Sequence, residues 1–519
     1  MRTNTVIPAF LTLGAVACSS QPEKAKTPNV IVILADDVGY GDLDWNGSET
    51  VRTPHVARMA AEGLRLTNAH TVAATSTPAR YGLLTGQYPW RREGTGIAAG
   101  NAGMVIRPEQ YTMADMFRSA GYATGAVGKW HLGLGDTTGS QDWNGRIAPG
   151  LEDIGFDYSY IMAATGDRVP CVYIENQRVV GLDPADPIEV SYTAPFPGEP
   201  TGKDNPELLR IRPSMGHDQS IVDGISRIGY MKGGMAARWH DEEIADRITD
   251  KACEFIERNS SGPFFLYFGT NDIHVPRVPH ERFAGRSGMG PRGDAILSLD
   301  YSVGRILSVL DSLGIADNTL VILSSDNGPI VDDGYEDRAE ELLGDHKPWG
   351  PFLGTKYSIY EAGTRVPMVV RWKGRIVPGS SDDALFSQID LFASLASLCG
   401  GTVGPGAALD SRDCLSVLLG EGGGGRSSAV VMNLQENLAI ISDGWKYVAP
   451  SDDPYTDSWS GYLYGNRPEA RLFDLRNDPA EQHDVMARHP EIAERLRREL
   501  EAVKADGGVW RERRSVPEK

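Results

Sequence analysis

A run of seven residues, NVIVILA at positions 29–35, decides the fold. Its side chains are continuously apolar and mostly β-branched, which predicts a strand buried on both faces of a parallel sheet. Asp36 and Asp37 follow it directly. Paired acids after a strand serve as a loop or a helix cap, but ligands also bind at the carboxyl ends of strands in open α/β sheets. Because adjacent carboxylates repel each other, a cation or a proton at this position would relieve them.

The rest of the chain alternates helical and strand-like patterns, which is typical of an α/β fold. Periodicity predicts helices over 54–63, 112–120, 244–256 and 296–313, and strands over 122–127, 263–268, 319–323 and 368–372. Thr112 and Asp115 have the spacing of a capping box, which supports the second helix. Residues 136–234 are rich in Pro, Gly and Asp, and we expect them to form an ordered insertion near the active site.

Four consecutive glycines, 422–425, mark a predicted boundary. Short strand-like runs follow at 429–434, 438–442 and 446–448, and a charged helix is predicted over 490–504. A chain of 519 residues is too long for one ordinary core. We therefore expect a large α/β domain over 28–425 and a smaller C-terminal part over 426–519.

The composition indicates a globular protein, with 41% hydrophobic residues and no apolar span long enough to cross a membrane. The formal net charge of -19 argues against a nucleic-acid partner, because nucleic acids are bound by basic surfaces. An anionic substrate would therefore be attracted by a local basic pocket and not by the overall field.

Residues 1–27 are predicted to be a signal peptide and a lipoprotein tether. Arg2 precedes an apolar stretch, 6–17, that is too short to span a membrane, and small residues lead up to Cys18. Cys18 resembles the lipid-attachment cysteine of bacterial lipoproteins. We expect an exported protein of a Gram-negative bacterium, anchored in the outer membrane through Cys18; the alternative is simple release into the periplasm.

Four further cysteines stand far apart in the chain: Cys171, Cys253, Cys399 and Cys414. No two of them form a C-x-x-C pair, so a metal cluster is not expected. One or two disulfides would fit an oxidising compartment. Cys253 and Cys399 lie in apolar helical patterns, which favours buried thiols at these two positions.

A short run at residues 75–86, TSTPARYGLLTG, combines a small nucleophile, a proline and an arginine. Ser76 fits the start of a helix, where a serine ordinarily caps the backbone. The same position lies in the positive potential of a helix N-terminus, and Arg80 is one turn along on the same face. That geometry suits an anion, so the cap and the functional interpretation of Ser76 both stay open on local grounds.

The run resembles the signature of the sulfatase family, which reads Cys or Ser, any residue, Pro, any residue and Arg, with Thr-Gly after a short gap. In that family the first residue is oxidised after translation to formylglycine, an aldehyde whose hydrate is the nucleophile. The serine at position 76 implies the serine-type subgroup. Maturation in this subgroup depends on a radical enzyme, which would be a partner of this chain.

Five further segments resemble active-site elements of that family and follow its order. They are DDVGYGDL at 36–43, GKWHLG at 128–133, NDIHVP at 271–276, SDNG at 325–328 and GTK at 354–356. Each alone has an ordinary interpretation, such as a solvated lysine, a core histidine or a turn. Together they span most of the chain, so the chain resembles the type I sulfatases of the alkaline-phosphatase-like superfamily.

This resemblance implies a fold and a set of site residues. The fold is a large, mixed, mostly parallel sheet sandwiched by helices, with a smaller C-terminal α+β subdomain that has an antiparallel sheet. One calcium ion would be held by Asp36, Asp37, Asp326 and Asn327, whose oxygens suit a hard cation. The catalytic residues would be Ser76, Arg80, Lys129, His131, His274 and Lys356.

The resemblance also implies their roles. Arg80 would orient the nucleophile, and Lys129 and Lys356 would hold sulfate oxygens. His274, with Lys356, would protonate the leaving oxygen, and His131 would take the proton whose removal expels sulfate. An unmodified serine would form a stable ester with no internal exit, so protein made without the maturation enzyme is expected to turn over poorly.

The implied substrate is a sulfated carbohydrate. We expect an exo-acting sulfatase for sulfated galactose or N-acetylgalactosamine of mucin or glycosaminoglycan. Asp167 and Arg168 in the insertion are candidates for gripping the sugar, with a surface ion pair as the alternative. Asp345 and His346 are further candidates, with a plain loop as the alternative.

Two other functions stay open. A phosphodiesterase or phosphonate monoester hydrolase of the same superfamily also keeps the metal aspartates, and comparing sulfate with phosphate release from matched aryl esters would separate them. A non-catalytic glycan-binding lipoprotein would have a dead active site, and the occupied catalytic positions disfavour it.

Overall fold

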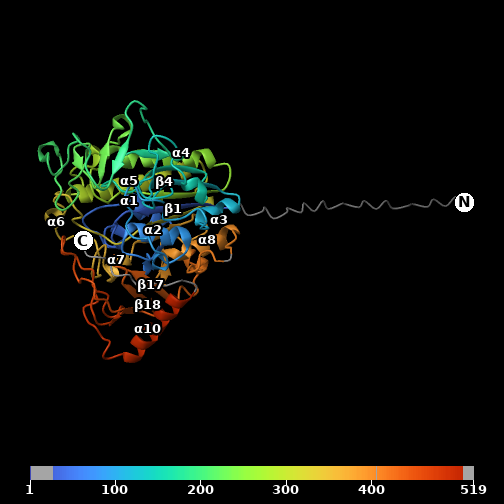
Figure 1. Cartoon of the computed structure of the whole chain (residues 1–519). Helices are drawn as coiled ribbons and strands as arrows, with labels where there is room; N and C mark the ends of the chain where they lie inside the picture. Colours follow the sequence, from blue (N-terminus) through green and yellow to red (C-terminus); the bar gives the residue numbers. More distant parts are fainter. Residues whose placement is uncertain (2–26, 405, 507–519) are drawn as a thin grey trace.

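The computed structural model describes Met1 and residues 27–404 and 406–506. Residues 2–26 of the predicted signal peptide and tether, including Cys18, lie outside the described residues. Within the described part, no helix is long and apolar enough to cross a membrane. The chain forms a large body around one sheet, and its C-terminal residues form a smaller sheet at one end (Figure 1).

A ten-stranded sheet lies at the centre, in the order β15-β2-β14-β13-β1-β12-β4-β5-β6-β7. β1 (Asn29–Ala35) pairs in parallel with β12 (Phe264–Gly269) on one side and with β13 (Thr319–Ser325) on the other. Every residue of these three strands is buried. The apolar run at 29–35 has no polar alternation because both faces of its strand are covered.

The remaining strands extend this sheet on both sides. They are β4 (Ala123–Lys129), β5 (Tyr158–Met162), β6 (Tyr173–Glu175), β7 (Arg178–Val179), β14 (Met368–Arg371), β2 (Leu64–Leu66) and β15 (Ser380–Asp382). β4 and β5 continue the parallel order. β6, β7 and β14 run antiparallel to their neighbours. The prediction of a large, mixed, mostly parallel sheet is confirmed.

Helices cover both faces of the sheet (Figure 1). On one face lie α1 (Pro54–Ala61), α4 (Ile244–Asn259) and α5 (Gly290–Ser312), and on the other lie α2 (Ser76–Thr85), α3 (Met113–Ser119) and α8 (Leu391–Cys399). Short helices α6 (Ala339–Leu342), α7 (Glu361–Thr364) and α9 (Leu415–Leu418) lie in connections. The predicted capping box of Thr112 and Asp115 is present. α5 starts six residues earlier than predicted, because Pro291 is accommodated in its first turn.

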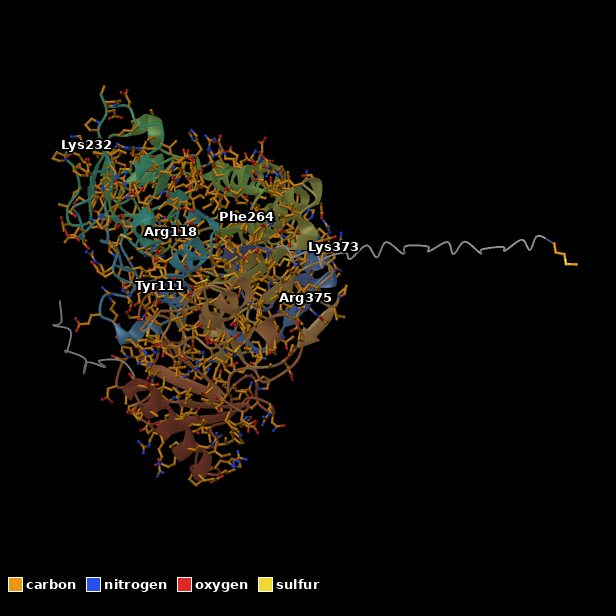
Figure 2. All side chains as sticks on the ribbon, turned by 90° about the vertical axis from the view of Figure 1, so that its right-hand side faces the viewer. Tyr111, Arg118, Lys232, Phe264, Lys373 and Arg375 are labelled. Atoms are coloured by element: carbon orange, nitrogen blue, oxygen red, sulfur yellow. The ribbon has the colours of Figure 1, made fainter. Side chains whose placement is uncertain are left out.

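The insertion at 136–234 is only partly irregular. β5, β6 and β7 lie within it and extend the main sheet to its edge. β8 (Glu189–Ser191) pairs with β11 (Tyr230–Lys232), and β9 (Ile221–Val222) with β10 (Ile225–Ser226). Another short pair joins β3 (Ala69–His70) and β16 (Phe386–Ser387). Lys232, which belongs to the insertion, is labelled in Figure 2 at the end of the molecule opposite the C-terminal sheet. Such short strands have too little periodicity to be predicted from sequence.

The four cysteines of the described residues are free thiols. Cys253 is buried, as predicted, whereas Cys399 is only partly buried and lies beside Met116. Among the described residues, the disulfides that an oxidising compartment would allow are therefore not formed.

The C-terminal sheet has four antiparallel strands, which confirms the predicted arrangement. They are β17 (Ser428–Met432), β18 (Leu438–Ser442), β19 (Trp445–Val448) and β20 (Arg471–Asp474). α10 (Pro490–Ala505) packs on this sheet through Ala493, Leu496 and Leu500. Ile359 and Tyr360 of the main body pack against a second set of its apolar side chains.

Backbone hydrogen bonds join the two sheets close to Ser76. The amide of Met432 in β17 donates to the carbonyl of Val72 at 3.0 Å, and the amide of Ala74 donates to the carbonyl of Met432 at 2.8 Å. The amide of Tyr357 donates to the carbonyl of Ala74 at 2.8 Å. The segment that leads into α2 is therefore held by a strand of the C-terminal sheet.

A buried charged cluster also joins the C-terminal sheet to the main body. Nζ of Lys446 in β19 lies 3.2 Å from Oε1 of Glu361 and 3.0 Å from Oε1 of Glu481, and none of the three side chains is exposed. Burial raises and Lys446 lowers the pKa of Glu361, with a net value of about 2. Burial raises the pKa of Glu481 to about 7. The charge of Lys446 opposes this rise, and the charge of Glu361 adds to it. One lysine thus neutralises one glutamate, and the other glutamate keeps its proton below about pH 7.

Glu481 is expected to make the folded protein less stable as the pH rises. Its folded-state pKa of about 7 exceeds the ordinary 4.5, so between these values the folded state binds more protons than the unfolded state. The free energy of unfolding should fall by roughly 2 kcal/mol from pH 5 to pH 8 through this group. Glu481→Gln should remove that fall, as measured by urea unfolding at both pH values. Equal pH dependence in the wild type and the variant would contradict the prediction.

Candidate active site

The polar residues that follow the central strands meet at one edge of the main sheet. β1 is followed by Asp36 and Asp37, and its neighbour β13 is followed by Asp326 and Asn327. Lys129 is the last residue of β4. Because parallel strands end at the same edge, side chains as far as 290 residues apart in sequence become neighbours.

Ser76 is the first residue of α2, which begins at this edge. Thr75 takes the N-cap position, so Ser76 does not act as the helix cap. Oγ of Ser76 accepts from Nζ of Lys129 at 2.9 Å and donates to Oδ1 of Asn327 at 3.4 Å. The Ser76 side chain therefore points into the polar cluster.

Four oxygen-bearing side chains beside Ser76 are fully buried: Asp36, Asp37, Asp326 and Asn327. Nδ2 of Asn327 donates to Oδ1 of Asp37 at 2.7 Å, and oxygens of Asp36 and Asp37 lie within 4.8 Å of each other and of a His274 nitrogen. Burial raises the pKa of Asp36 well above its ordinary value; Lys129 opposes this, and the charges of Asp326 and Asp37 add to it. This crowded, all-oxygen set fits a hard cation such as calcium.

Three buried cations balance these carboxylates. Nζ of Lys129 lies 2.6 Å from both carboxylate oxygens of Asp36. Arg80 donates from Nε and Nη2 to Oδ2 of Asp326 at 3.0 and 2.7 Å. Burial raises the pKa of Asp326, but Arg80 and Lys129 outweigh it and lower the pKa to about 2. Asp326 therefore stays ionised at neutral pH.

Lys356 is the third cation and lies between two acids. Its Nζ is 2.9 Å from Oδ2 of Asp37 and 2.9 Å from Oδ2 of Asp333. The hydroxyl of Tyr357 donates to the other oxygen of Asp333 at 2.9 Å. Burial lowers the pKa of Lys356, but Asp333 and Asp37 outweigh it and raise the pKa well above its ordinary value. Lys356 is therefore an ammonium group at neutral pH.

The geometry around His131 fixes its tautomer. Nε2 lies 3.0 Å from the carbonyl oxygen of Ala98, which only accepts, so Nε2 carries the proton. Nδ1 is buried and has no hydrogen-bond partner among the described residues. Burial, and then the charges of Lys129 and Arg168, lower the pKa of His131 well below its ordinary value. The neutral ring therefore offers Nδ1 as a proton acceptor.

His274 is likewise neutral. Its Nδ1 donates to the carbonyl oxygen of Val275 at 2.7 Å, which leaves the lone pair on Nε2. Nε2 lies 3.8 Å from an oxygen of Asp37 and 3.9 Å from an oxygen of Asp333. Burial, and then the charge of Lys356, lower the pKa of His274 well below its ordinary value.

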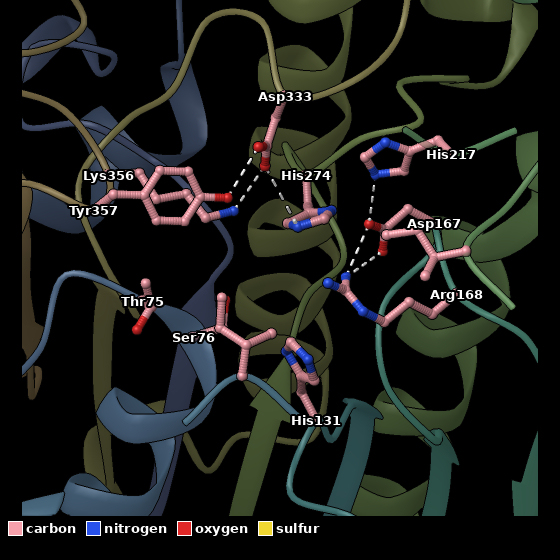
Figure 3. Close-up of a pocket in the computed structure, with 12 residues that line it drawn as sticks. Thr75, Ser76, His131, Asp167, Arg168, His217, His274, Asp333, Lys356 and Tyr357 are labelled. Carbon is pink, nitrogen blue, oxygen red and sulfur yellow. Dashed lines mark hydrogen bonds and ion pairs between the residues drawn. The ribbon is translucent and has the colours of Figure 1, made fainter. Parts of the chain in front are cut away.

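These groups border one pocket (Figure 3). Among the predicted site residues, six line it: Ser76, His131, His274, Lys356, Asp167 and Arg168. Arg80, Lys129 and the four predicted metal ligands lie behind this lining and have no exposed surface. The structure thus brings the predicted catalytic and metal-binding residues into one site.

Asp167 is the centre of one wall of the pocket (Figure 3). Its Oδ2 accepts from Nη1 of Arg168 at 2.8 Å and lies 3.0 Å from Nε2 of His217, and Oδ1 accepts from the hydroxyl of Thr165. Nδ1 of His217 faces the carbonyl oxygen of Met215 at 2.8 Å. Both ring nitrogens of His217 thus face acceptors, and these partners raise its pKa although burial opposes them. The Asp167 side chain is only 3% exposed, so the pair is not an open surface ion pair.

A model of the family described as Sulfatase matches residues 28–401. The chain belongs to the sulfatase family. This sulfatase is 52% identical over 482 residues to an N-acetylgalactosamine-6-O-sulfatase of Bacteroides thetaiotaomicron, a match that covers 93% of the chain and 94% of the relative. It is also 30% identical to a steryl-sulfatase of Rattus norvegicus, over 92% of the chain and 88% of that protein.

Solved structures agree with this family assignment. A sulfatase from work on the metabolism of multiple glycosaminoglycans by Bacteroides thetaiotaomicron matches with a TM-score of 0.91 and 52% identity, covering 93% of this chain and all of that one. A phosphonate monoester hydrolase of Agrobacterium radiobacter matches with a TM-score of 0.57 and 18% identity, over 92% of this chain and 96% of that one, which shows the fold alone. With its family and its named sulfatase relative, the chain is a sulfuric ester hydrolase.

Asp345 and His346 do not line the pocket of the sulfatase. Asp345 is exposed. His346 is buried, and its Nε2 lies 2.8 Å from Oδ1 of Asp42, which also accepts from Arg292 at 2.7 Å. His346 therefore satisfies a buried carboxylate, and its placement does not support the predicted contact of these two residues with a sugar.

Four polar residues of the sulfatase pocket were not among the predicted site residues: Thr75, Asp333, Tyr357 and His217. Asp333 follows Asn327 by six residues and Tyr357 follows Lys356 directly, so both lie beside predicted segments. His217 has no such signal in its local sequence. Tyr357 and His217 have φ angles of 76° and 50°, in the left-handed region that non-glycine residues adopt uncommonly and that occurs often at functional sites.

Proposed function

We propose that this sulfatase removes sulfate from galactose or N-acetylgalactosamine at the end of a mucin or glycosaminoglycan chain, through a formylglycine at Ser76 and a bound calcium ion. The observation that carries the proposal is the position of Ser76. Its side chain contacts the buried charged cluster through Lys129, and it lines the same pocket as the polar residues of the Asp167 wall. The Bacteroides N-acetylgalactosamine-6-O-sulfatase, at 52% identity, supports the substrate class.

Asp36, Asp37, Asp326 and Asn327 would hold the calcium, and position 76 would carry the formylglycine. When present, these two groups supply a Lewis acid and a hydrated aldehyde that attacks sulfur and can be regenerated. Arg80, held by Asp326, and Lys129 keep two fixed positive charges beside position 76. Such charges stabilise the oxygens of a sulfate group in the transition state without having to reorganise.

Proton transfer would be divided between opposite sides of the pocket. His131, neutral with a free Nδ1, is the base that accepts a proton from the group at position 76. Lys356, kept protonated by Asp333 and Asp37, is the group that donates a proton to the leaving sugar oxygen. His274 is neutral in this arrangement, so its part is to accept a hydrogen bond and orient that region.

The wall of Asp167, Arg168 and His217 would bind the sugar. The carboxylate of Asp167 accepts from sugar hydroxyls and the guanidinium of Arg168 donates to them, which gives charge-assisted hydrogen bonds. Both ring nitrogens of His217 already face acceptors, so His217 holds Asp167 in place. The three side chains are fixed to one another before any substrate arrives. This preorganised wall at the side of a small pocket supports action on a terminal sugar.

The route of the protein in the cell is part of the proposal. Serine at position 76 predicts a serine-type maturation enzyme as a partner. The N-terminal sequence predicts export with a lipid anchor at Cys18. Both follow from sequence alone. An exported and anchored enzyme would meet extracellular glycans.

Sulfate release from a panel of sugars tests the function. We expect turnover of galactose 6-sulfate and N-acetylgalactosamine 6-sulfate, with much slower release from aryl phosphates and aryl phosphonates. Because a distant phosphonate monoester hydrolase shares the fold, the matched aryl esters are the necessary comparison. Faster release of phosphate or phosphonate than of sulfate would overturn the proposal.

Calcium should stabilise the folded sulfatase. The four buried oxygen donors exist together only in the folded chain, so an ion that binds them shifts the unfolding equilibrium. At calcium concentrations about 100 times Kd the gain is roughly 2.7 kcal/mol, visible as a higher Tm than in excess chelator. Asp37→Asn should abolish most of this shift. An unchanged Tm in wild-type protein, with and without chelator, would contradict the prediction.

A further inference from the structure

Trp459 is the most exposed large apolar side chain within residues 27–404 and 406–506. It exposes 72% of its surface. Single exposed apolar residues are common and need no explanation by themselves. The position of Trp459 relative to the pocket gives it a different meaning.

The indole ring of Trp459 lies against the backbone beside the sugar wall. Its Cζ3 atom is 3.5 Å from the position that a Cβ on Gly216 would occupy. Gly216 is followed by His217, whose ring lines the pocket and contacts Asp167. The ring thus contacts the residue that directly precedes a residue of the pocket lining.

A second contact fixes the same loop to the neighbouring pocket segment. The amide of Asp332 donates to the hydroxyl of Tyr462 at 2.9 Å, and Asp333, the next residue, lines the pocket. The loop that carries Trp459 therefore lies against two pocket segments, one from the insertion and one that follows β13.

The Trp459 loop is ordered by its own hydrogen bonds. Thr456 and Leu463 form an antiparallel bridge, and the amide of Asp457 donates to the carbonyl of Tyr462 at 2.8 Å. The carboxylate of Asp457 accepts from the amide of Ser460 and from the hydroxyl of Tyr464, each at 2.9 Å. The exposed ring thus sits on a loop that needs no further ordering to bind a ligand, which lowers the entropy cost of a contact.

From this geometry we infer that Trp459 is a stacking platform for the sugar next to the sulfated one. The inference rests on the proposed function and adds a second sugar-binding position outside the pocket. A pyranose has an apolar face of C–H groups, and the electron-rich face of an indole attracts such hydrogens. With the sulfated sugar in the pocket, the next sugar would lie beside the Gly216 segment that Trp459 contacts.

Binding measurements on an inactive background test this inference independently of turnover. The probes are N-acetylgalactosamine 6-sulfate and a tetrasaccharide with the same sugar at its non-reducing end. Kd is measured by calorimetry for Ser76→Ala alone and combined with Trp459→Ala, Trp459→Phe or Val377→Ala. Val377 is the matched control, because it is 67% exposed and lies two residues after Arg375, on the flank marked in Figure 2.

Trp459→Ala should weaken tetrasaccharide binding about tenfold, near the low end of the loss for a nucleobase stacked on an aromatic side chain. Binding of the monosaccharide should change less than twofold. Trp459→Phe should restore most of the tetrasaccharide affinity, and Val377→Ala should change neither ligand.

Three results would overturn the platform. They are equal losses for both ligands, unchanged tetrasaccharide binding in Trp459→Ala, and a tetrasaccharide that binds no more tightly than the monosaccharide. Sulfate release by the wild type, measured with the same two sugars, tests the proposed function separately. The platform can therefore fail while the sulfatase function stands.

Discussion

Replacing Ser76 by alanine is expected to lower sulfate release by about 10⁴-fold or more, as loss of a nucleophile does in other hydrolases. The Ser76 side chain makes two hydrogen bonds, to Lys129 and Asn327, and is 3% exposed. Its removal leaves the surrounding charges paired with one another, so the fold should persist. Activity should therefore be lost with little change in Tm.

The chemical state of Ser76 gives the control for this experiment. Tryptic peptide 66–80 contains Ser76, and conversion to formylglycine removes two hydrogen atoms from its mass. Wild-type protein made without a maturation enzyme should lack this change and behave like Ser76→Ala in turnover while still binding sugar. Full activity of protein whose peptide 66–80 is unmodified would show that the formylglycine assignment is wrong.

Asp326→Ala is expected to destabilise the protein by about 3–5 kcal/mol, because it removes one partner of a buried ion pair. Arg80 has no exposed surface, and its two donors to Asp326 would lose their acceptor. The nearest remaining carboxylate, Asp36, is 4.0 Å from Arg80 and already bonds Lys129. Urea unfolding measures the loss, and sulfate release should disappear together with it.

Asp311→Ala is the matched control for Asp326→Ala. Asp311 also accepts from an arginine, Arg58, at 2.7 Å, but its side chain is 35% exposed. Solvent-exposed ion pairs contribute about 0–1 kcal/mol, so this variant should unfold close to the wild type. If both variants lost the same small amount of stability, the idea that Arg80 depends on Asp326 would have to be abandoned.

The parts of the fold that could be predicted are those with a strong local pattern. The apolar run at 29–35 identified the central strand because a strand covered on both faces leaves no polar side. The capping box at Thr112 identified the start of α3 for a similar reason. The start of α5 and the strands β5 to β11 could not be predicted in this way, because tertiary contacts and not local periodicity determine them.

The same reason separates the site residues that could be predicted from those that could not. Asp36, Asp37, Asp326 and Asn327 directly follow buried strands, so topology alone brings them together. His217 reaches the pocket from the middle of the insertion, where no regular element indicates its direction. His346 is the opposite case. It lies near a segment that resembles the family, but in the fold it forms a hydrogen bond with the buried carboxylate of Asp42.

The backbone bonds of Met432 to Val72 and Ala74 have a consequence for engineering this enzyme. A truncated catalyst that ended at the glycine stretch 422–425 would lose the strand that aligns the approach to α2, and Glu361 would lose its contact with Lys446. Shortening the gene at that linker should therefore give an inert product. Co-expressing both halves as separate polypeptides should restore turnover, because the C-terminal sheet holds the segment that precedes Ser76.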